Sequence, residues 1–274
     1  MTLAALLDQL DSDAIERACA GERAALEVLV STMQRPFYNL ALRVLGDRSL
    51  AEDAAQECLL RVVTHLSEFK GEARFSTWAT RIAVNATLDF RSGMARSVRY
   101  GFNDFAERLA QGLDNDAPDR PDDALLVKQA KTLCNRALLQ CLDGDHRAAF
   151  VLGEILEFEA ADAAETLALE PPAYRKRFSR ARAALTEALA KTCSVHTPGL
   201  PCACHRKVND AIRKGRIAPE ALVVRIGDLA QLRTRLGALD SATRTLTIYR
   251  SDELPDLRRE VLAKVRAALL PIAG

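Results

Sequence analysis

The sequence predicts a mainly α-helical chain, in which two helical domains are joined by a flexible linker and followed by a small mixed α/β extension. Three observations lead to this prediction. Only 5% of the 274 residues are aromatic, and Ala and Leu, which favour helices, dominate the apolar residues. Apolar residues recur at the spacing of one helix face in several segments. A stretch rich in Asp, Pro and Gly separates two groups of such segments.

Residues 12–92 are predicted as the first helical domain. Ser49 and Glu52 have the spacing of a capping box, which predicts that a helix begins there. One face of this helix is apolar. The opposite face carries Asp53, Gln56, Glu57 and Leu60. A break at 67–74 then precedes another helix, expected over about 76–91.

Residues 67–91 combine aromatic, cationic and amide side chains in the pattern of single-stranded nucleic-acid binding. Aromatic rings stack on unpaired bases, cations neutralise phosphates, and amides contact base edges. For Trp78 a place in the core explains the pattern equally well, whereas the loop residues Phe69, Lys70 and Arg74 are harder to explain as core. The candidate binding residues are Phe69, Lys70, Arg74, Thr77, Trp78, Arg81 and Asn85.

Residues 93–127 are predicted as a flexible acidic linker. They contain seven acidic residues and four arginines, which gives a net charge of −3. The part that reads GLDNDAPDRPDDA has no apolar periodicity. Such a composition buries too little apolar surface to offset the entropy of ordering.

Residues 128–191 are predicted as a second helical domain that contains a helix-turn-helix. Its first helix is expected at 159–168, its turn at 169–172, and its second helix over 172–184. The second helix has an apolar stripe and an almost entirely cationic opposite face, which suits the major groove of DNA. A solvated basic face on an ordinary helix is the alternative. The candidate DNA-binding residues are Tyr174, Arg175, Lys176, Arg177, Ser179 and Arg180.

Two motifs in this order resemble a known family. The run LGDRSLAEDAAQECLLRVVTHLSEFKGEARFSTWATRIAVNATLDFR resembles the second conserved region of bacterial sigma factors of the extracytoplasmic-function type. The stretch 138–189 resembles their fourth conserved region, and the linker falls where this family has one. The resemblance covers roughly residues 12–191. It implies a cytoplasmic transcription initiation factor, not an enzyme, whose partners are core RNA polymerase, duplex −35 DNA and single-stranded −10 DNA. A separate anti-sigma partner is left open.

The resemblance also implies roles for individual residues. The face with Asp53, Gln56, Glu57 and Leu60 matches the helix that docks on the clamp coiled coil of RNA polymerase. The loop 67–75 and the start of the next helix match the element that captures a flipped −10 base. The helix 172–184 matches the −35 reader. The chain departs from the family at Ala168, where glycine is common, although the proline pair in the turn can compensate by fixing φ.

Residues 192–274 are predicted as a regulatory extension, in which ALVVRI and TRTLTIYR are candidate short strands. Its first part reads TCSVHTPGLPCACHRK and concentrates potential ligands for zinc or another thiophilic metal. The favoured metal ligands are Cys193, His196, Cys202 and Cys204, with His205 as the alternative histidine. A redox pair of Cys202 and Cys204, or inert thiols, are the competing interpretations. Cys19, Cys58, Cys134 and Cys141 lie in helical, partly apolar settings and are assigned no role.

Composition limits the remaining function classes. The net charge is +1, so any nucleic-acid binding depends on local clusters of charge. The sequence predicts no signal peptide, no membrane span and no membrane partner. A stand-alone helix-turn-helix repressor is one alternative, but it leaves residues 49–91 unexplained. A zinc enzyme is another, but no motif supplies an acid/base carboxylate near the candidate ligands.

Overall fold

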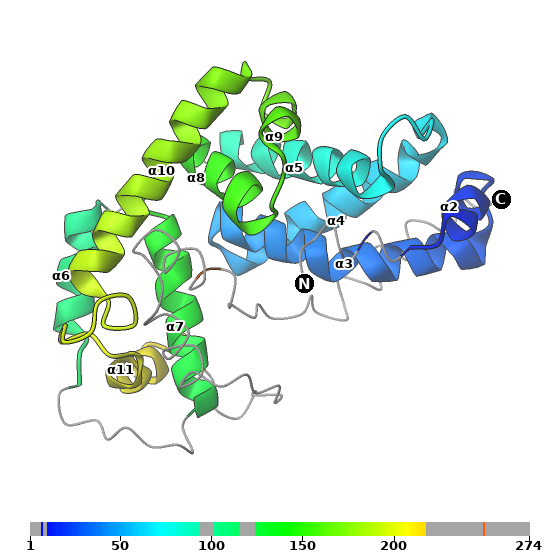
Figure 1. The fold of residues 1–274 in the computed structure, drawn as a ribbon. Helices are drawn as coiled ribbons and strands as arrows, with labels where there is room; N and C mark the ends of the chain where they lie inside the picture. Colours follow the sequence, from blue (N-terminus) through cyan, green and yellow to red (C-terminus); the bar gives the residue numbers. More distant parts are fainter. Residues whose placement is uncertain (1–6, 8–9, 94–100, 115–123, 218–248, 250–274) are drawn as a thin grey trace. The chain divides into compact units, whose positions relative to one another are not determined.

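The computed structural model describes residues 7, 10–93, 101–114, 124–217 and 249 (Figure 1). Within these residues the chain forms helices and no strand, which confirms the mainly α-helical prediction. The candidate strand at 221–226 lies outside the described residues, and of 243–250 only Tyr249 is described. The elements are α2 (Ser12–Cys19), α3 (Arg23–Leu45), α4 (Arg48–Thr64), the 3-10 turn η1 (Leu66–Glu68), α5 (Phe75–Gly93), α6 (Phe102–Gln111), α7 (Ala124–Leu139), α8 (Gly144–Phe150), the π-helical turn η3 (Val151–Ile155), α9 (Ala160–Thr166), α10 (Pro171–Thr192), the 3-10 turn η4 (Cys204–Lys207) and α11 (Val208–Arg213).

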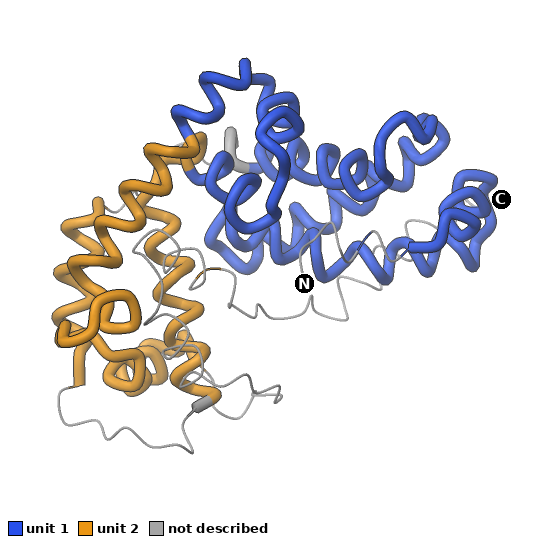
Figure 2. Tube along the Cα trace, in the orientation of Figure 1, with its two compact units in different colours: residues 1–97, 147–177, 255–274 blue, residues 98–146, 178–254 orange. Residues whose placement is uncertain are grey.

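The chain divides into two compact units (Figure 2). Unit 1 contains the described residues of Met1–Ser97 and Arg147–Arg177, and unit 2 those of Val98–His146 and Phe178–Leu254. The units therefore divide the segment 128–191, which the sequence predicts as one domain. None of the described helices is long and apolar enough to cross a membrane.

Unit 1 is built on α3, α4 and α5, whose apolar faces form one core. Small side chains line the seam between α4 and α5, where Cys58, Ala83 and Ala86 are fully buried. The Cys58 thiol donates to the carbonyl of Ala83 at 3.2 Å, and the Thr87 hydroxyl donates to the same carbonyl at 2.7 Å. Burial raises the pKa of Cys58 to about 12. Cys58 is therefore a packing residue, as its place on the apolar stripe predicts.

The connection between α3 and α4 is a two-residue turn. Gly46 ends α3 in the left-handed conformation with φ 77°. Asp47 then caps α4, and its carboxylate accepts a hydrogen bond from the Leu50 N–H at 3.0 Å. The predicted capping box at Ser49 is wrong, because α4 already begins at Arg48 and Glu52 is buried.

A tight turn joins α9 to α10 in the predicted helix-turn-helix. Ala168 has φ 51°, in the left-handed region that favours glycine. The Ala168 N–H donates to Glu165 O at 3.0 Å and the Leu169 N–H donates to Ala164 O at 2.9 Å, which is the hydrogen-bond pattern of a Schellman motif. The turn thus keeps the backbone of a glycine-terminated helix without the glycine.

Unit 2 contains α6, α7, α10 from Phe178 onward, η4 and α11. The helix α6 lies within 93–127, so the prediction of a flexible linker is wrong for residues 102–111. The structural reason is that the end of α6 contacts the segment after α10. Lys207 Nζ donates to Leu109 O at 3.3 Å, the Asp114 N–H donates to Arg206 O at 2.9 Å, and Asn209 Nδ2 donates to Asp114 Oδ2 at 2.6 Å.

We expect Ala168→Gly to stabilise the protein by about 1 kcal/mol. The left-handed conformation costs a non-glycine residue about 1–2 kcal/mol. The greater freedom of glycine in the unfolded chain offsets part of the stabilisation that removing this cost would give. Urea unfolding of the full chain measures the change. Ala183→Gly, at an exposed helical position of α10, is the matched control and should destabilise by about 1 kcal/mol. Destabilisation by both variants would contradict the interpretation of the turn.

We expect Gly112→Ala to loosen the contact between α6 and residues 204–213. A Cβ atom at Gly112 would lie 2.1 Å from Lys207 Nζ and 2.6 Å from Asp210 Oδ2, so these side chains must move. Hydrogen exchange of the backbone amides in 204–213 should become faster. Gly101→Ala is the control, because its Cβ would meet no atom closer than 3.6 Å. Equal exchange in both variants and the parent would contradict the prediction.

Candidate nucleic-acid interface

Three aromatic rings pack together where α5 begins. The ring of Phe69 lies 5.4 Å from that of Phe75 and 5.3 Å from that of Trp78, measured between centroids. Phe75 is buried, whereas Phe69 and Trp78 are partly exposed. Packing of this kind holds the loop 69–74 against α5. Trp78 is therefore compatible both with a place in the core and with nucleic-acid binding, since one part of the side chain packs and another part remains at the surface.

Cationic and polar side chains surround this aromatic cluster. Lys70, Arg74, Arg81 and Asn85 are exposed, and Thr77 is half-buried. The loop turns at Gly71, which has φ 74°. Arg81 forms an ion pair with Glu165 of α9. All seven candidate −10 residues thus belong to one loop and the first three turns of one helix, and every one except Arg81 and Asn85 lies within ten residues of Phe69.

The candidate polymerase-binding face lies on α4. Asp53 is exposed, and Gln56, Glu57 and Leu60 are half-buried. Arg61 accounts for part of the burial of Glu57, because it pairs with Glu57 at 2.6 Å. Arg61 also pairs with Asp89 of α5 at 2.6 Å. These hydrogen bonds raise the pKa of Arg61 above its usual value. The ion pairs fasten this face of α4 to α5, the helix that carries the aromatic cluster.

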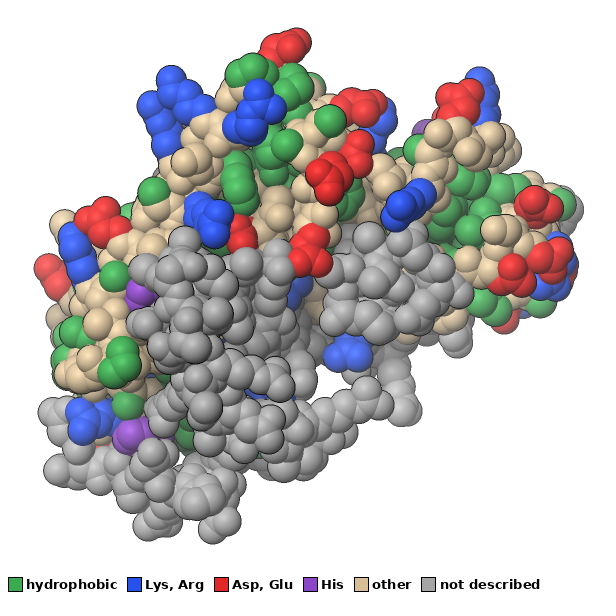
Figure 3. All heavy atoms as spheres, viewed as in Figure 1, with side chains coloured by type: hydrophobic (Ala, Val, Ile, Leu, Met, Phe, Trp, Pro, Cys, Tyr) green, Lys and Arg blue, Asp and Glu red, His purple; other side chains and the backbone are tan. Residues whose placement is uncertain are grey.

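The candidate −35 residues lie on α10, and Figure 3 shows Lys and Arg side chains projecting from this helix. Arg175, Lys176, Ser179 and Arg180 are exposed, and Arg177 is half-buried. Tyr174 differs from the prediction. It is 2% exposed, and its hydroxyl donates to Ala149 O at 3.5 Å. Burial raises its pKa to about 12, so Tyr174 is a core residue that cannot face DNA in this conformation.

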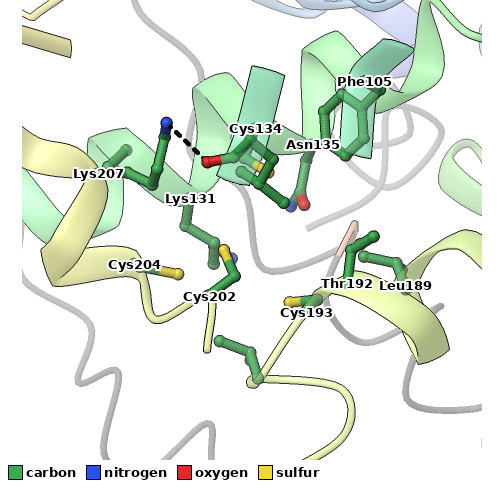
Figure 4. Close-up of a pocket in the computed structure, with 13 residues that line it drawn as sticks. Phe105, Lys131, Cys134, Asn135, Leu189, Thr192, Cys193, Cys202, Cys204 and Lys207 are labelled. Atoms are coloured by element: carbon green, nitrogen blue, oxygen red, sulfur yellow. Dashed lines mark hydrogen bonds between the residues drawn. The ribbon is translucent and has the colours of Figure 1, made fainter. Parts of the chain in front are cut away.

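A small cavity of about 20 Å³ in unit 2 brings together three of the candidate metal ligands (Figure 4). Cys193, Cys202 and Cys204 line it, and Cys134 of α7 lines it too. His196 does not line it; this side chain is buried elsewhere, with Nδ1 3.0 Å from the hydroxyl of Thr197. Sequence reasoning missed Cys134, because only the fold brings it to cysteines that lie 59 to 70 positions further along the chain.

The thiols of this cavity differ from reactive cysteines. Burial raises the pKa of Cys202 to about 11. Burial also raises the pKa of Cys134 well above its ordinary value, and the three neighbouring cysteines raise it further. Thiols with raised pKa values are poor nucleophiles at neutral pH. Within the described residues, no three His, Cys, Asp or Glu side chains already lie close enough together to hold a metal ion.

Comparison with known proteins places these features in a family. Residues 29–96 match the family model of sigma-70 region 2, and this range includes most of α3 and all of α4, α5 and the loop between them. The RNA polymerase sigma-H factor of Pseudomonas aeruginosa is 28% identical over 188 residues, which cover 67% of this chain and 96% of that protein. The ECF RNA polymerase sigma factor SigW of Bacillus subtilis is 27% identical over 184 residues, which cover 64% of this chain and 94% of that protein.

A solved structure, that of CnrH in complex with the cytosolic domain of CnrY, covers 64% of this chain and 94% of that chain, with 24% identity and a TM-score of 0.45. The case for the family rests instead on the sequence relatives. These relatives align with this chain over nearly their whole length. The family model matches the helices that carry the candidate polymerase and −10 residues. The chain is similar to RNA polymerase sigma factors of the extracytoplasmic-function type, and these matches support a sigma factor of this type, a class of transcription initiation factors and not of enzymes.

Proposed function

We propose that this sigma factor binds core RNA polymerase through α4, opens and captures the −10 strand with the loop before α5, and reads the −35 duplex with α10. The observation that carries the proposal is the aromatic cluster at 69–78, which lies inside the sigma-70 region 2 match and is surrounded by exposed cations. Unpaired bases stack on aromatic rings, and the nearby cations neutralise their phosphates. We expect the protein to act in the cytoplasm, where RNA polymerase is located.

The polymerase contact is proposed for Asp53, Gln56, Glu57 and Leu60. Their partial exposure on one face of α4 leaves them accessible, while the opposite face is buried against α3 and α5. The −10 contact is proposed for the aromatic cluster with Lys70, Arg74, Thr77, Arg81 and Asn85. The −35 contact is proposed for five of the six predicted residues: Arg175, Lys176, Arg177, Ser179 and Arg180. Tyr174 is left out because it is buried and supports the helix from within.

Regulation through the C-terminal segment is a further part of the proposal. Its support is the cluster of cysteines directly after α10, which suits a thiophilic metal such as zinc or a redox change. An anti-sigma partner stays a prediction from the family resemblance.

The sigma activity is tested by run-off transcription with core RNA polymerase from the DNA that precedes the protein's own gene. We expect promoter-specific transcripts with the full chain, and none with core polymerase alone. Lys70→Ala and Asn85→Ala should reduce open-complex formation, because both side chains are exposed beside the aromatic cluster. Binding of duplex DNA by the protein alone, without any transcripts, would instead indicate a stand-alone regulator.

The role of α10 predicts a change in salt dependence. Arg175→Ala should weaken promoter binding by the holoenzyme and reduce the slope of log K against log salt by about 0.9, the value for one lost phosphate contact. Arg23→Ala is the matched control, because Arg23 is similarly exposed and pairs within its own helix α3. An unchanged slope for Arg175→Ala, or an equal change for both variants, would contradict the −35 assignment.

A further inference from the structure

Four of the seven cysteines converge on the cavity in unit 2. Cys134 comes from α7, Cys193 follows the last residue of α10, and Cys202 and Cys204 come from the next loop and η4. Figure 4 shows Cys193 and Cys204 extending from opposite sides toward Cys202. Cys202 and Cys204 are each 8% exposed. Four thiols line a cavity of about 20 Å³, which leaves room for about one water-sized atom, so an ion fits.

We propose that Cys134, Cys193, Cys202 and Cys204 form a four-thiolate site for a thiophilic divalent metal, with zinc as the expected ion. The proposal deepens the regulatory part of the proposed function, because it names the ligands of the responsive site. Binding forms four metal–sulfur bonds and releases the four thiol protons to solvent. It requires the thiols to draw inward by rotation of their side chains, because zinc–sulfur bonds are about 2.3 Å long.

The charges around the cavity support this ligand set. Four thiolates and one divalent ion leave two net negative charges, which are costly to bury without cations nearby. Lys131 and Lys207 line the same cavity, and their side chains are largely buried. Lys207 also pairs with Asp210 at 3.4 Å, so the two lysines offset these charges only in part. Cys134 lines the cavity and His196 does not, so the lining favours Cys134 as the fourth ligand.

The backbone supports the site as well. The Ser194 N–H donates to Cys202 O at 3.1 Å, which holds the two ends of the loop together. Cys193 accepts from the N–H groups of His196 and Thr197, and its own N–H continues the α10 hydrogen bonds to Leu189 O at 2.9 Å. The loop that brings Cys202 back therefore starts and ends beside the cavity. Low exposure and a fixed backbone suit a structural metal site better than a redox pair, which needs access to an oxidant.

The test uses Co²⁺ as a spectroscopic probe on the full chain, purified with a reductant and stripped by a chelator. We expect one Co²⁺ per chain, an absorption band from sulfur-to-cobalt charge transfer, and displacement by Zn²⁺. Cys134→Ser should reduce the intensity of this band by about a quarter, since three of four thiolates remain. Cys141→Ser and His196→Gln are matched controls that should leave it unchanged. Absence of the band in the parent chain would overturn the proposal, as would its loss in His196→Gln with no change in Cys134→Ser.

A second measurement needs no variant and so does not depend on variant folding. The parent chain is alkylated with and without Zn²⁺, and each cysteine is followed by mass spectrometry. We expect zinc to slow the alkylation of the four cavity cysteines and to leave Cys141 unaffected. An equal rate at Cys134 with and without zinc would exclude it from the site. Neither measurement involves polymerase or DNA, so a failed transcription assay and a failed metal assay are separate results.

Discussion

The close packing of α4 against α5 is the constraint on which unit 1 depends. The seam is made of small side chains, and two hydrogen bonds from Cys58 and Thr87 meet at the carbonyl of Ala83. Interiors are packed to crystal-like density, so a seam of this kind fixes the two helices in one arrangement. That arrangement determines where α5 begins and therefore where the aromatic cluster lies. It also turns the polar face of α4 outward, so the proposed polymerase and −10 surfaces are parts of one rigid body.

In unit 2 the corresponding constraint is the packing of the segment after α10 against α6 and α7. This segment makes hydrogen bonds to Leu109 and Asp114 at the end of α6, and its cysteines lie against Cys134 of α7. Residues 193–213 are therefore an integral part of unit 2 and not a separate appendage. Residues of α7 and of the last turn of α10 line the same cavity, so the proposed metal site would join these two elements.

Local patterns predicted the fold where each helix carries its own signal. The apolar stripes of α4 and α10, the turn before α10 and the aromatic cluster are all readable from short windows. Long-range contacts explain the failures. In α6, Phe102, Phe105 and Leu109 have helical spacing, but the acidic residues around them hid a helix that packs against α7 and against residues 206–209. Tyr174 has the helical spacing of the buried residues Ala181, Leu185 and Leu189, so its burial agrees with the apolar stripe of α10 and not with the predicted contact to DNA. Cys134 has no local signal at all.

Zinc binding at the proposed cysteine site would supply enough free energy for the proposed regulation. Moving a two-state equilibrium from one percent to ninety-nine percent requires about 5.5 kcal/mol of differential binding. Structural zinc sites bind with about 10–16 kcal/mol at neutral pH, so a tetrathiolate site that forms in only one arrangement of 193–207 exceeds the requirement. Arg180, the proposed DNA-reading residue nearest the cluster, lies thirteen positions before Cys193, about 20 Å along the axis of α10 at 1.5 Å per residue. An effect over that distance must act on α10 as a whole helix, by changing what holds its C-terminal end, and not on the conformation of Arg180 itself.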